Sequence, residues 1–305
     1  MKPKLAKFKK NTQIYLRMKY LLIVLTILTY GCEKNTTITF QDDVSLVINS
    51  FFIPDSNLRV NISESLSMTS NRDVSFRNDM LVNIYENNHL LGVMKNVENG
   101  NYTLDFKPKA GEKYSIQTQV KGFEDCFAED IIPPLVKILK YDTSQIENKL
   151  IANIEFKDPD NMRNYYLLEF RVKKFHYLSI NGNKPDTTFY TESSSFTCDD
   201  PLIEGELNAG DGFFYGFYFS DEKIDGKTIR LPCELYLNQI KSFNIYLKSI
   251  SYNYYMYAKS YEKFLNTDLE MAMFSEPLPM YSNISNGFGI FAGYQQDSVS
   301  ITLAD

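Results

Sequence analysis

The sequence predicts a mainly β protein, in which an N-terminal immunoglobulin-like β-sandwich is followed by a second β-rich domain with one amphipathic helix. Aromatic usage is the first observation behind this prediction: the 305 residues include 22 Tyr and 22 Phe but no Trp, and both residue types favour strands. The second is a rhythm of short apolar or alternating runs, separated by polar turns about every ten residues. The third is that a single stretch shows the three-and-four spacing of a helix.

Seven short strands are predicted before Pro134. Asn87 and Asn88 tolerate the left-handed conformation of a tight hairpin, so the apolar residues on either side of them are expected to pair. Pro133 and Pro134 remove two successive backbone donors, which predicts a boundary between a sandwich domain at 44–134 and a second domain at 135–305. The apolar runs of the first domain lie at 45–53, 58–66, 80–87, 99–106, 111–120 and 124–132.

The second domain is predicted to contain further strands and the helix. Ser251 would cap a helix near 252–266, in which Tyr254, Tyr257, Tyr261, Phe264 and Leu265 form one apolar face. The end of the chain, from Gly287, is expected to form two closing strands around a polar turn. The other strands, rich in β-branched and aromatic residues, are predicted at 150–156, 164–178, 212–220 and 242–250.

An apolar run near the N-terminus, residues 21–30, ends at Gly31 and Cys32. A membrane-spanning helix needs about 20 apolar residues, so this run is too short to span a bilayer. Seven basic residues and no acid precede it, which is the flank of an export signal. The stretch resembles a bacterial lipoprotein signal, in which the cysteine thiol is lipidated and becomes the first mature residue. We therefore expect a signal peptide at 1–31, with Met18 as an alternative start, lipid on Cys32 and a tether at 32–43.

The predicted mature chain is acidic. The seven basic residues of the signal lie before Cys32, so 25 basic and 38 acidic residues remain and the formal charge is −13. Such a charge repels nucleic acid backbones and anionic head groups. No nucleic-acid partner is expected, and lipid on Cys32 rather than charge would hold the protein at a membrane.

Few residues point to catalysis. The two histidines of the chain, His89 and His176, fall in a predicted turn and a predicted strand, so neither a Ser-His-Asp set nor a histidine metal site can be assembled. The glycine patterns at 210–216 and 286–293 lack the strand, loop and helix of a phosphate-binding site. We expect no catalytic residue and no cofactor.

Two acidic stretches could bind calcium through oxygen ligands. Asp158 and Asp160 lie in the stretch FKDPDN, and Asp221 and Asp225 lie in SDEKIDG. Neither stretch has the spacing and glycine of an EF-hand loop, and Asp-Pro-Asp-Asn is also typical of a type I turn. Turn formation is the favoured interpretation, with calcium binding as the alternative.

The remaining cysteines bear on disulfide formation, which export to an oxidising compartment permits. Once Cys32 carries lipid, three cysteines are left. Cys198 and Cys233 both fall in the second domain near a proline and are predicted to pair. Cys126 is expected to stand alone in a strand of the first domain.

Several motifs carry a family resemblance that covers nearly the whole predicted mature chain. The sequence resembles domain-of-unknown-function family four-two-four-nine, a family of exported lipoproteins of Bacteroidota, and the run from Ser249 to Tyr294 is its most specific part. The resemblance implies an outer-membrane lipoprotein, often encoded beside a TonB-dependent transporter, and it transfers no catalytic residue. In chain order the motifs are GCE, SLVINSFF, NGNYTL, AGEKYSIQT, IIPP, FKDPDNMRNYYLLEF, FSDEKIDGKT, LKSISYNYYMYAKSYE and PLPMYSNISNGFGIFAGY.

Two classes of function follow as expectations. The first is a non-enzymatic, lipid-anchored accessory protein that binds a ligand or docks on a TonB-dependent transporter through tyrosine-rich surfaces. The alternative is a carboxylate-dependent hydrolase of the cell envelope, for example a glycan-degrading one. Only Glu33 is an acid close behind Cys32, so the sequence leaves open whether the protein faces the periplasm or the outside.

Overall fold

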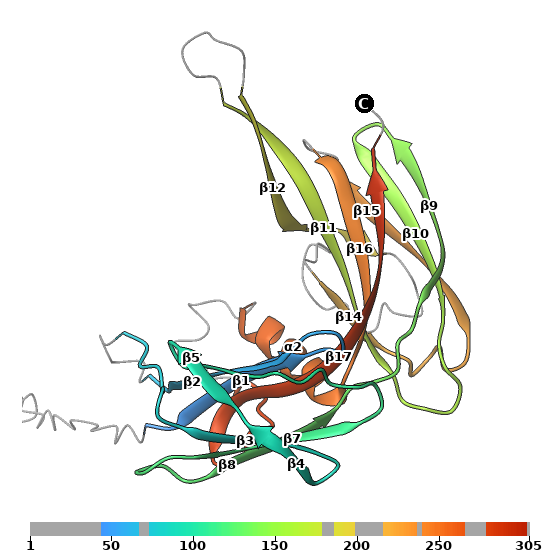
Figure 1. Cartoon of the computed structure of the whole chain (residues 1–305). Coiled ribbons are helices and arrows are strands. Elements are labelled where there is room, and N and C mark those ends of the chain that lie inside the picture. Colours follow the sequence, from blue (N-terminus) through green and yellow to red (C-terminus); the bar gives the residue numbers. More distant parts are fainter. Residues whose placement is uncertain are drawn as a thin grey trace, which may run out of the picture. The chain divides into compact units, whose positions relative to one another are not determined.

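The computed structural model describes residues 44–66, 73–178, 186–198, 216–236, 240–265 and 279–303 and, within these ranges, all side chains except those of 175–178, 186–188 and 265. Residues 44–305 form one compact unit. The described part is mainly β, with several sheets and one helix, α2 (Tyr252–Leu265) (Figure 1). The predicted mainly β class with one helix is confirmed.

The first sandwich packs two sheets against each other. Alternate residues of its strands point inward, as the two-residue period of a strand requires, so Leu46, Ile48 and Phe52 are buried. They share a core with Tyr114 and Ile116 of the facing sheet. One sheet contains β1 (Leu46–Phe52), β2 (Leu58–Glu64), β6 (Asn101–Leu104) and β5 (Lys95–Glu98), and the other has the order β4 (His89–Val93), β3 (Leu81–Glu86), β7 (Lys113–Gln119) and β8 (Cys126–Ile131).

The second sandwich is built in the same way, mostly from longer strands. Its core is largely aromatic, since Phe156, Tyr166, Phe170, Phe219 and Phe243 are all buried in it. These rings account for part of the aromatic excess of the composition. One sheet has the order β13 (Thr197–Cys198), β15 (Thr228–Tyr236), β10 (Lys149–Lys157) and β9 (Ile138–Ile146), and the other contains β12 (Asp186–Ser194), β11 (Tyr165–Leu178), β14 (Phe217–Ser220) and β16 (Ile240–Ile250).

A 16-residue strand, β17 (Gly287–Thr302), belongs to both sandwiches. Its first half pairs in parallel with β1, from Leu46 opposite Gly287 to Phe52 opposite Gly293. Its second half pairs antiparallel with β16. The two pairings join the sheets into one of nine strands, with the order β12-β11-β16-β17-β1-β2-β6-β5 and with β14 beside β11 (Figure 1).

Two features of the end of the chain differ from the prediction. Gln295 and Gln296 do not form a turn, because their backbone continues β17 opposite Ser249 and Lys248 of β16. One strand therefore replaces the two predicted closing strands.

The predicted second domain, 135–305, is not self-contained, because Ile284 and Phe291 fill the core of the first sandwich.

The helix begins at the predicted position. Tyr254 N donates a hydrogen bond to Ser251 Oγ at 3.1 Å, so Ser251 caps the first turn. The Ser251 hydroxyl donates to the carboxylate of Asp130 on β8. That carboxylate also accepts from Gly293 N at 3.0 Å and from Asn253 Nδ2 at 3.1 Å. Asp130 thus connects the first sandwich to the helix and to β17.

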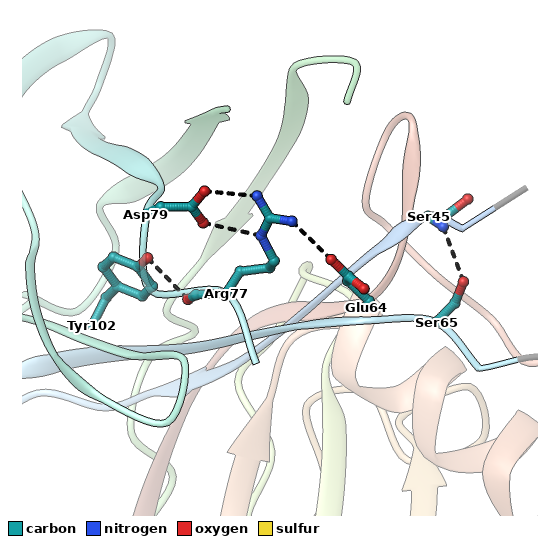
Figure 2. A network of polar contacts seen from close by, with 6 residues as sticks. All are labelled: Ser45, Glu64, Ser65, Arg77, Asp79 and Tyr102. Atoms are coloured by element: carbon teal, nitrogen blue, oxygen red, sulfur yellow. Dashed lines mark hydrogen bonds and ion pairs between the residues drawn. The ribbon is translucent and has the colours of Figure 1, made fainter. Parts of the chain in front are cut away.

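The end of the first sandwich at which the described chain begins is fixed by polar contacts around Arg77 (Figure 2). The guanidinium donates to Glu64 Oε1 at 2.8 Å and to both carboxylate oxygens of Asp79 at 3.0 and 2.7 Å. Tyr102 OH donates to the Arg77 carbonyl at 3.0 Å. These contacts hold the segment 73–79 alongside β2.

Candidate functional site

Two loops of the second sandwich meet and bring acidic side chains together. One loop links β10 to β11, and the other links β14 to β15. Carboxylate oxygens of Asp158, Asp221 and Asp225 lie within 4.8 Å of one another, and we call these three residues the acidic cluster. The two stretches that the sequence presented as separate candidates therefore form one site. Asp160, the fourth predicted ligand, is outside the cluster.

Asp158 is fully buried and already bonded to protein donors. Its carboxylate accepts one hydrogen bond from Tyr166 OH and another from Gly226 N at 3.0 Å. Burial raises the pKa of this carboxyl, the two hydrogen bonds offset part of the rise, and the charges of Asp221 and Asp225 add to it. Burial also raises the pKa of Tyr166, so its phenol remains a donor.

Asp221 is buried as well and holds the start of β11. Its Oδ2 accepts from Asn164 N at 2.7 Å, and its Oδ1 accepts from Arg163 Nη1 at 3.2 Å. The Arg163 side chain is half exposed, so this ion pair is partly solvated. The hydrogen bond to Asp221 raises the pKa of Arg163, which supplies positive charge beside the three carboxylates.

Asp225 and Gly226 complete the junction of the loops. Asp225 Oδ1 accepts from Asn161 N at 3.1 Å. Gly226 has a φ of +69°, and a Cβ at this position would lie 1.9 Å from Asp160 Oδ1, so a larger residue would be strained and would displace the Asp160 carboxylate. An open hollow of about 300 Å³ lies at the junction, lined by Asn161, Met162, Arg163, Asp221, Glu222 and Asp225.

The acidic cluster is compatible with two interpretations. Calcium takes about six to eight oxygen ligands, of which three carboxylates could supply a share. Each carboxylate of the cluster, however, also accepts a protein N–H or O–H bond, as two mutually locked turns require. Turn formation explains every one of these contacts, so it remains the favoured interpretation.

The described residues include three cysteines, Cys126, Cys198 and Cys233. Cys198 on β13 stands opposite Cys233 on β15, and the two form a disulfide with Cα atoms 4.4 Å apart. Cys126 is free and buried in β8, where its thiol donates to the Asn286 carbonyl at 3.3 Å and burial raises its pKa. Cys32, the predicted lipid attachment residue, lies outside the described residues.

The histidines and glycine patterns add no further site. His89 is the exposed first residue of β4, and its Nδ1 lies 3.1 Å from the Asn87 carbonyl oxygen. The side chain of His176 and most of the glycine pattern at 210–216 lie outside the described residues. The pattern at 286–293 contributes the start of β17 and is used for strand pairing with β1.

Sequence reasoning did not single out Tyr166 or Arg163, the partners that hold the acidic cluster in place. The missing signal was the pairing of β10 with β15, which sets Lys157 opposite Thr228. A prediction that paired these two strands would have brought the loops at their ends together. Neither partner residue stands out by type or spacing alone.

The fold and the loops define a class of protein: two β-sandwiches that share one strand, with a locked pair of acidic loops on the second sandwich. The chain belongs to the family described as Domain of unknown function (DUF4249), whose pattern matches residues 33–300. Comparison with curated proteins gives no match. Within the described ranges, no helix is long and apolar enough to cross a membrane.

Proposed function

We propose that the protein is a non-enzymatic lipoprotein held in the outer membrane by lipid on Cys32. The observation that carries this proposal is the position of that cysteine. It follows a basic flank and a short apolar run, and the family match begins at the next residue, 33. A family domain that starts directly behind the cysteine is what a removable lipoprotein signal predicts.

Within the envelope, the proposed role is ligand binding or docking as an accessory of a TonB-dependent transport system. A tyrosine ring offers a large apolar area with a polar tip, which suits stacking on sugars and protein interfaces. The exposed tyrosines favour the second sandwich and α2 as the binding region. Tyrosines at least 44 % exposed there are Tyr141, Tyr190, Tyr236, Tyr252 and Tyr261.

The anchor is tested by membrane fractionation of a Cys32→Ala variant. The parent protein is expected to float with membranes, and the variant is expected to leave the membrane fraction because it cannot be lipidated. Cys126→Ala controls for the loss of a cysteine as such, since Cys126 is buried within the first sandwich. A Cys32→Ala protein that still floats would show that the anchor is wrong.

The docking role is tested by cross-linking and purification of the lipidated protein from its own membranes. A TonB-dependent transporter that copurifies would support the role. Binding of the purified protein to glycans, peptides or iron chelates would define the ligand class. If neither a transporter nor any of these ligands binds, the accessory role is wrong even where the anchor holds.

The alternative proposal, a carboxylate-dependent hydrolase, has one observation in its favour. Asp221 and Asp225 line an open hollow beside Asp158, whose pKa is raised. Asp158 itself is fully buried and does not line the hollow, so binding is the better-supported function. Hydrolysis of envelope glycans that persists through purification and disappears in Asp225→Asn would reverse this preference.

A further inference from the structure

Large apolar side chains are exposed at the end of the first sandwich where the described chain begins. An exposed apolar group that stands alone needs no explanation, but a set of them at one end of a molecule marks an interaction surface. We call this set the tether-end patch. Its members, each 44 to 54 % exposed, are Val44, Leu66, Val74, Phe76 and Phe288.

Strand pairing places two of the aromatic members in one row. Val47 on β1 stands opposite Phe288 on one side and opposite Ser63 on the other. Ser63 is bridged in turn to Phe76. Directly opposed residues of neighbouring strands share a face of the sheet, so Phe288 and Phe76 lie on the same face.

Backbone contacts place the other members at the same end of these strands. Ser45 N donates to Ser65 Oγ at 3.0 Å (Figure 2). Ser65 N donates to the Ser45 carbonyl at 2.8 Å, and this pairing sets Val44 opposite Leu66. Glu64 N donates to the carbonyl of Ser75 at 2.8 Å, which places Val74 at the same end of β2.

Three charged groups beside the patch are paired with one another. Arg77 forms ion pairs with Glu64 and Asp79 (Figure 2), and its guanidinium lies 5.1 Å from the centre of the Phe123 ring. One cation and two anions leave no excess positive charge with which this network could attract anionic head groups. The patch therefore offers apolar area, which suits the interface of a bilayer.

The chain that precedes Val44 indicates what occupies the patch. Cys32 lies twelve residues before Val44, and twelve residues span at most about 40 Å. A link this short gives the two sites that it joins an effective concentration of about a millimolar or more. Even a weak affinity of the patch for lipid is then sufficient to keep it seated.

We infer that the tether-end patch rests on the lipid surface that holds Cys32, an inference that depends on the proposed lipid anchor. β1 and β17 run in the same direction, from Leu46 beside Gly287 to Phe52 beside Gly293. Beyond Gly293, β17 pairs with β16 and continues into the second sandwich (Figure 1). Docking through the patch presents the second sandwich, with its exposed tyrosines, away from the membrane.

The absence of Trp from the sequence makes a direct test available, since a single introduced Trp reports only its own surroundings. The lipidated full-length protein is reconstituted in phosphatidylcholine–phosphatidylethanolamine vesicles with or without brominated acyl chains, which quench Trp on contact. Phe76→Trp and Phe288→Trp are the test variants. Phe189→Trp, at a position 52 % exposed on β12, is the matched control.

In the test variants, emission is expected to shift to the blue on vesicles and to fall about twofold with brominated lipid. The reason is that interfacial side chains insert about 5–10 Å into the boundary between head groups and acyl chains. The control is expected to show neither change. Test variants that float with vesicles but are quenched no more than Phe189→Trp would overturn the inference and leave the anchor intact.

Three further outcomes would also overturn it. A blue-shifted emission of the test variants in a vesicle-free Cys32→Ala background would mean that the chain itself covers the patch. An emission that depends on protein concentration instead of lipid would assign the patch to a second copy of the chain. A parent protein that does not float at all would remove the lipid anchor on which the inference depends.

Discussion

Asp158 and Asp130 are buried aspartates that each accept hydrogen bonds from neighbouring elements. Asp158 joins the two acidic loops through Tyr166 and Gly226. Asp130 joins β8 to the start of α2 and to β17. Burial raises the pKa of both carboxyls, so the fold uses their oxygens as acceptors and disfavours their charge.

Truncation of Asp158 is expected to destabilise the second sandwich. Asp158→Ala leaves the buried Tyr166 hydroxyl and Gly226 N–H without their acceptor, which costs about 1–3 kcal/mol for each such group. Asp158→Asn keeps one acceptor oxygen and is expected to cost less than Asp158→Ala. Urea unfolding measures the difference, with Asp160→Ala as an exposed control. An Asp158→Ala protein as stable as the control would contradict the locked-loop interpretation.

Calcium is the second test of the same loops. Because each of the three carboxylates already accepts a hydrogen bond from a protein donor, we expect the thermal midpoint to be the same in calcium and in chelator. A midpoint that rises with calcium, and that no longer rises in Asp225→Asn, would establish a calcium site in place of the locked turns.

The pH dependence of stability is expected to depend on Asp130. Burial raises its pKa to about 6 in the folded protein, above the value of about 3.9 in an unfolded chain. The carboxyl therefore favours folding most at low pH, and this contribution is lost as the pH rises from about 4 through 6. As the pH rises over that range, the free energy of unfolding of Asp130→Asn should increase by about 2–3 kcal/mol relative to that of the parent. Denaturant unfolding at a series of pH values checks this, and a difference that does not change with pH would refute it.

The members of the acidic cluster could be predicted by residue type, but their meeting could not. Asp158 and Asp225 are 67 positions apart, and the pairing of β10 with β15 is what brings their loops together. The pairing of Cys198 with Cys233 could be predicted because three cysteines remain once Cys32 is assigned to the lipid. The Tyr166 donor carries no local signal, since a tyrosine in an apolar strand also fits a core position.

Among the elements, β17 approaches β1 closely at Gly289, where the two strands pair. Gly289 has a φ of +107°, and a Cβ there would lie 2.1 Å from the Ile48 carbonyl oxygen. Gly111 also has a positive φ, of +80°, but a Cβ there would meet nothing within 4 Å. Alanine at position 111 would therefore introduce backbone strain alone, whereas alanine at position 289 would introduce backbone strain and a steric clash with β1.

Replacement of these glycines by alanine should give different losses of stability. Gly111→Ala is expected to cost about 1–2 kcal/mol, which is the penalty of a left-handed backbone for an L-residue. Gly289→Ala is expected to cost clearly more, because its Cβ also forces β1 and β17 apart. Chemical unfolding of both variants gives the comparison. Equal losses would mean that the parallel pairing tolerates the added methyl group.

The elements that could be predicted are those with a clear periodicity. The helix near 252–266 combines a capping serine with rings at helical spacing, and α2 occupies Tyr252–Leu265. β9 was missed because it lies at a sheet edge and has almost no buried face, so no alternation marks it. β15 was missed because Pro232 interrupts it. The described residues of β13 pair with Cys233 and Glu234 of β15 and not with Pro232. The missing N–H of the proline therefore breaks no pairing with them.

In the molecule as a whole, local patterns could predict a β-sandwich followed by a second β-rich domain, but not the strand that the two share. Parallel pairing of β1 with β17 joins residues about 240 positions apart, and no local pattern specifies such a contact. This pairing gives the molecule a direction, from the end at Val44 toward the second sandwich. The tether-end patch and the exposed tyrosines of the second sandwich then lie at different ends of the unit 44–305.

Mass spectrometry of the N-terminal peptide of the membrane-purified protein tests for the lipid anchor on Cys32. We expect a peptide that begins at Cys32 and carries the mass of a diacylglyceryl group on its sulfur. The residues before Cys32 should be absent from the mature protein. A mature chain that retains those residues, or that contains Cys32 as an unmodified thiol, would contradict the account.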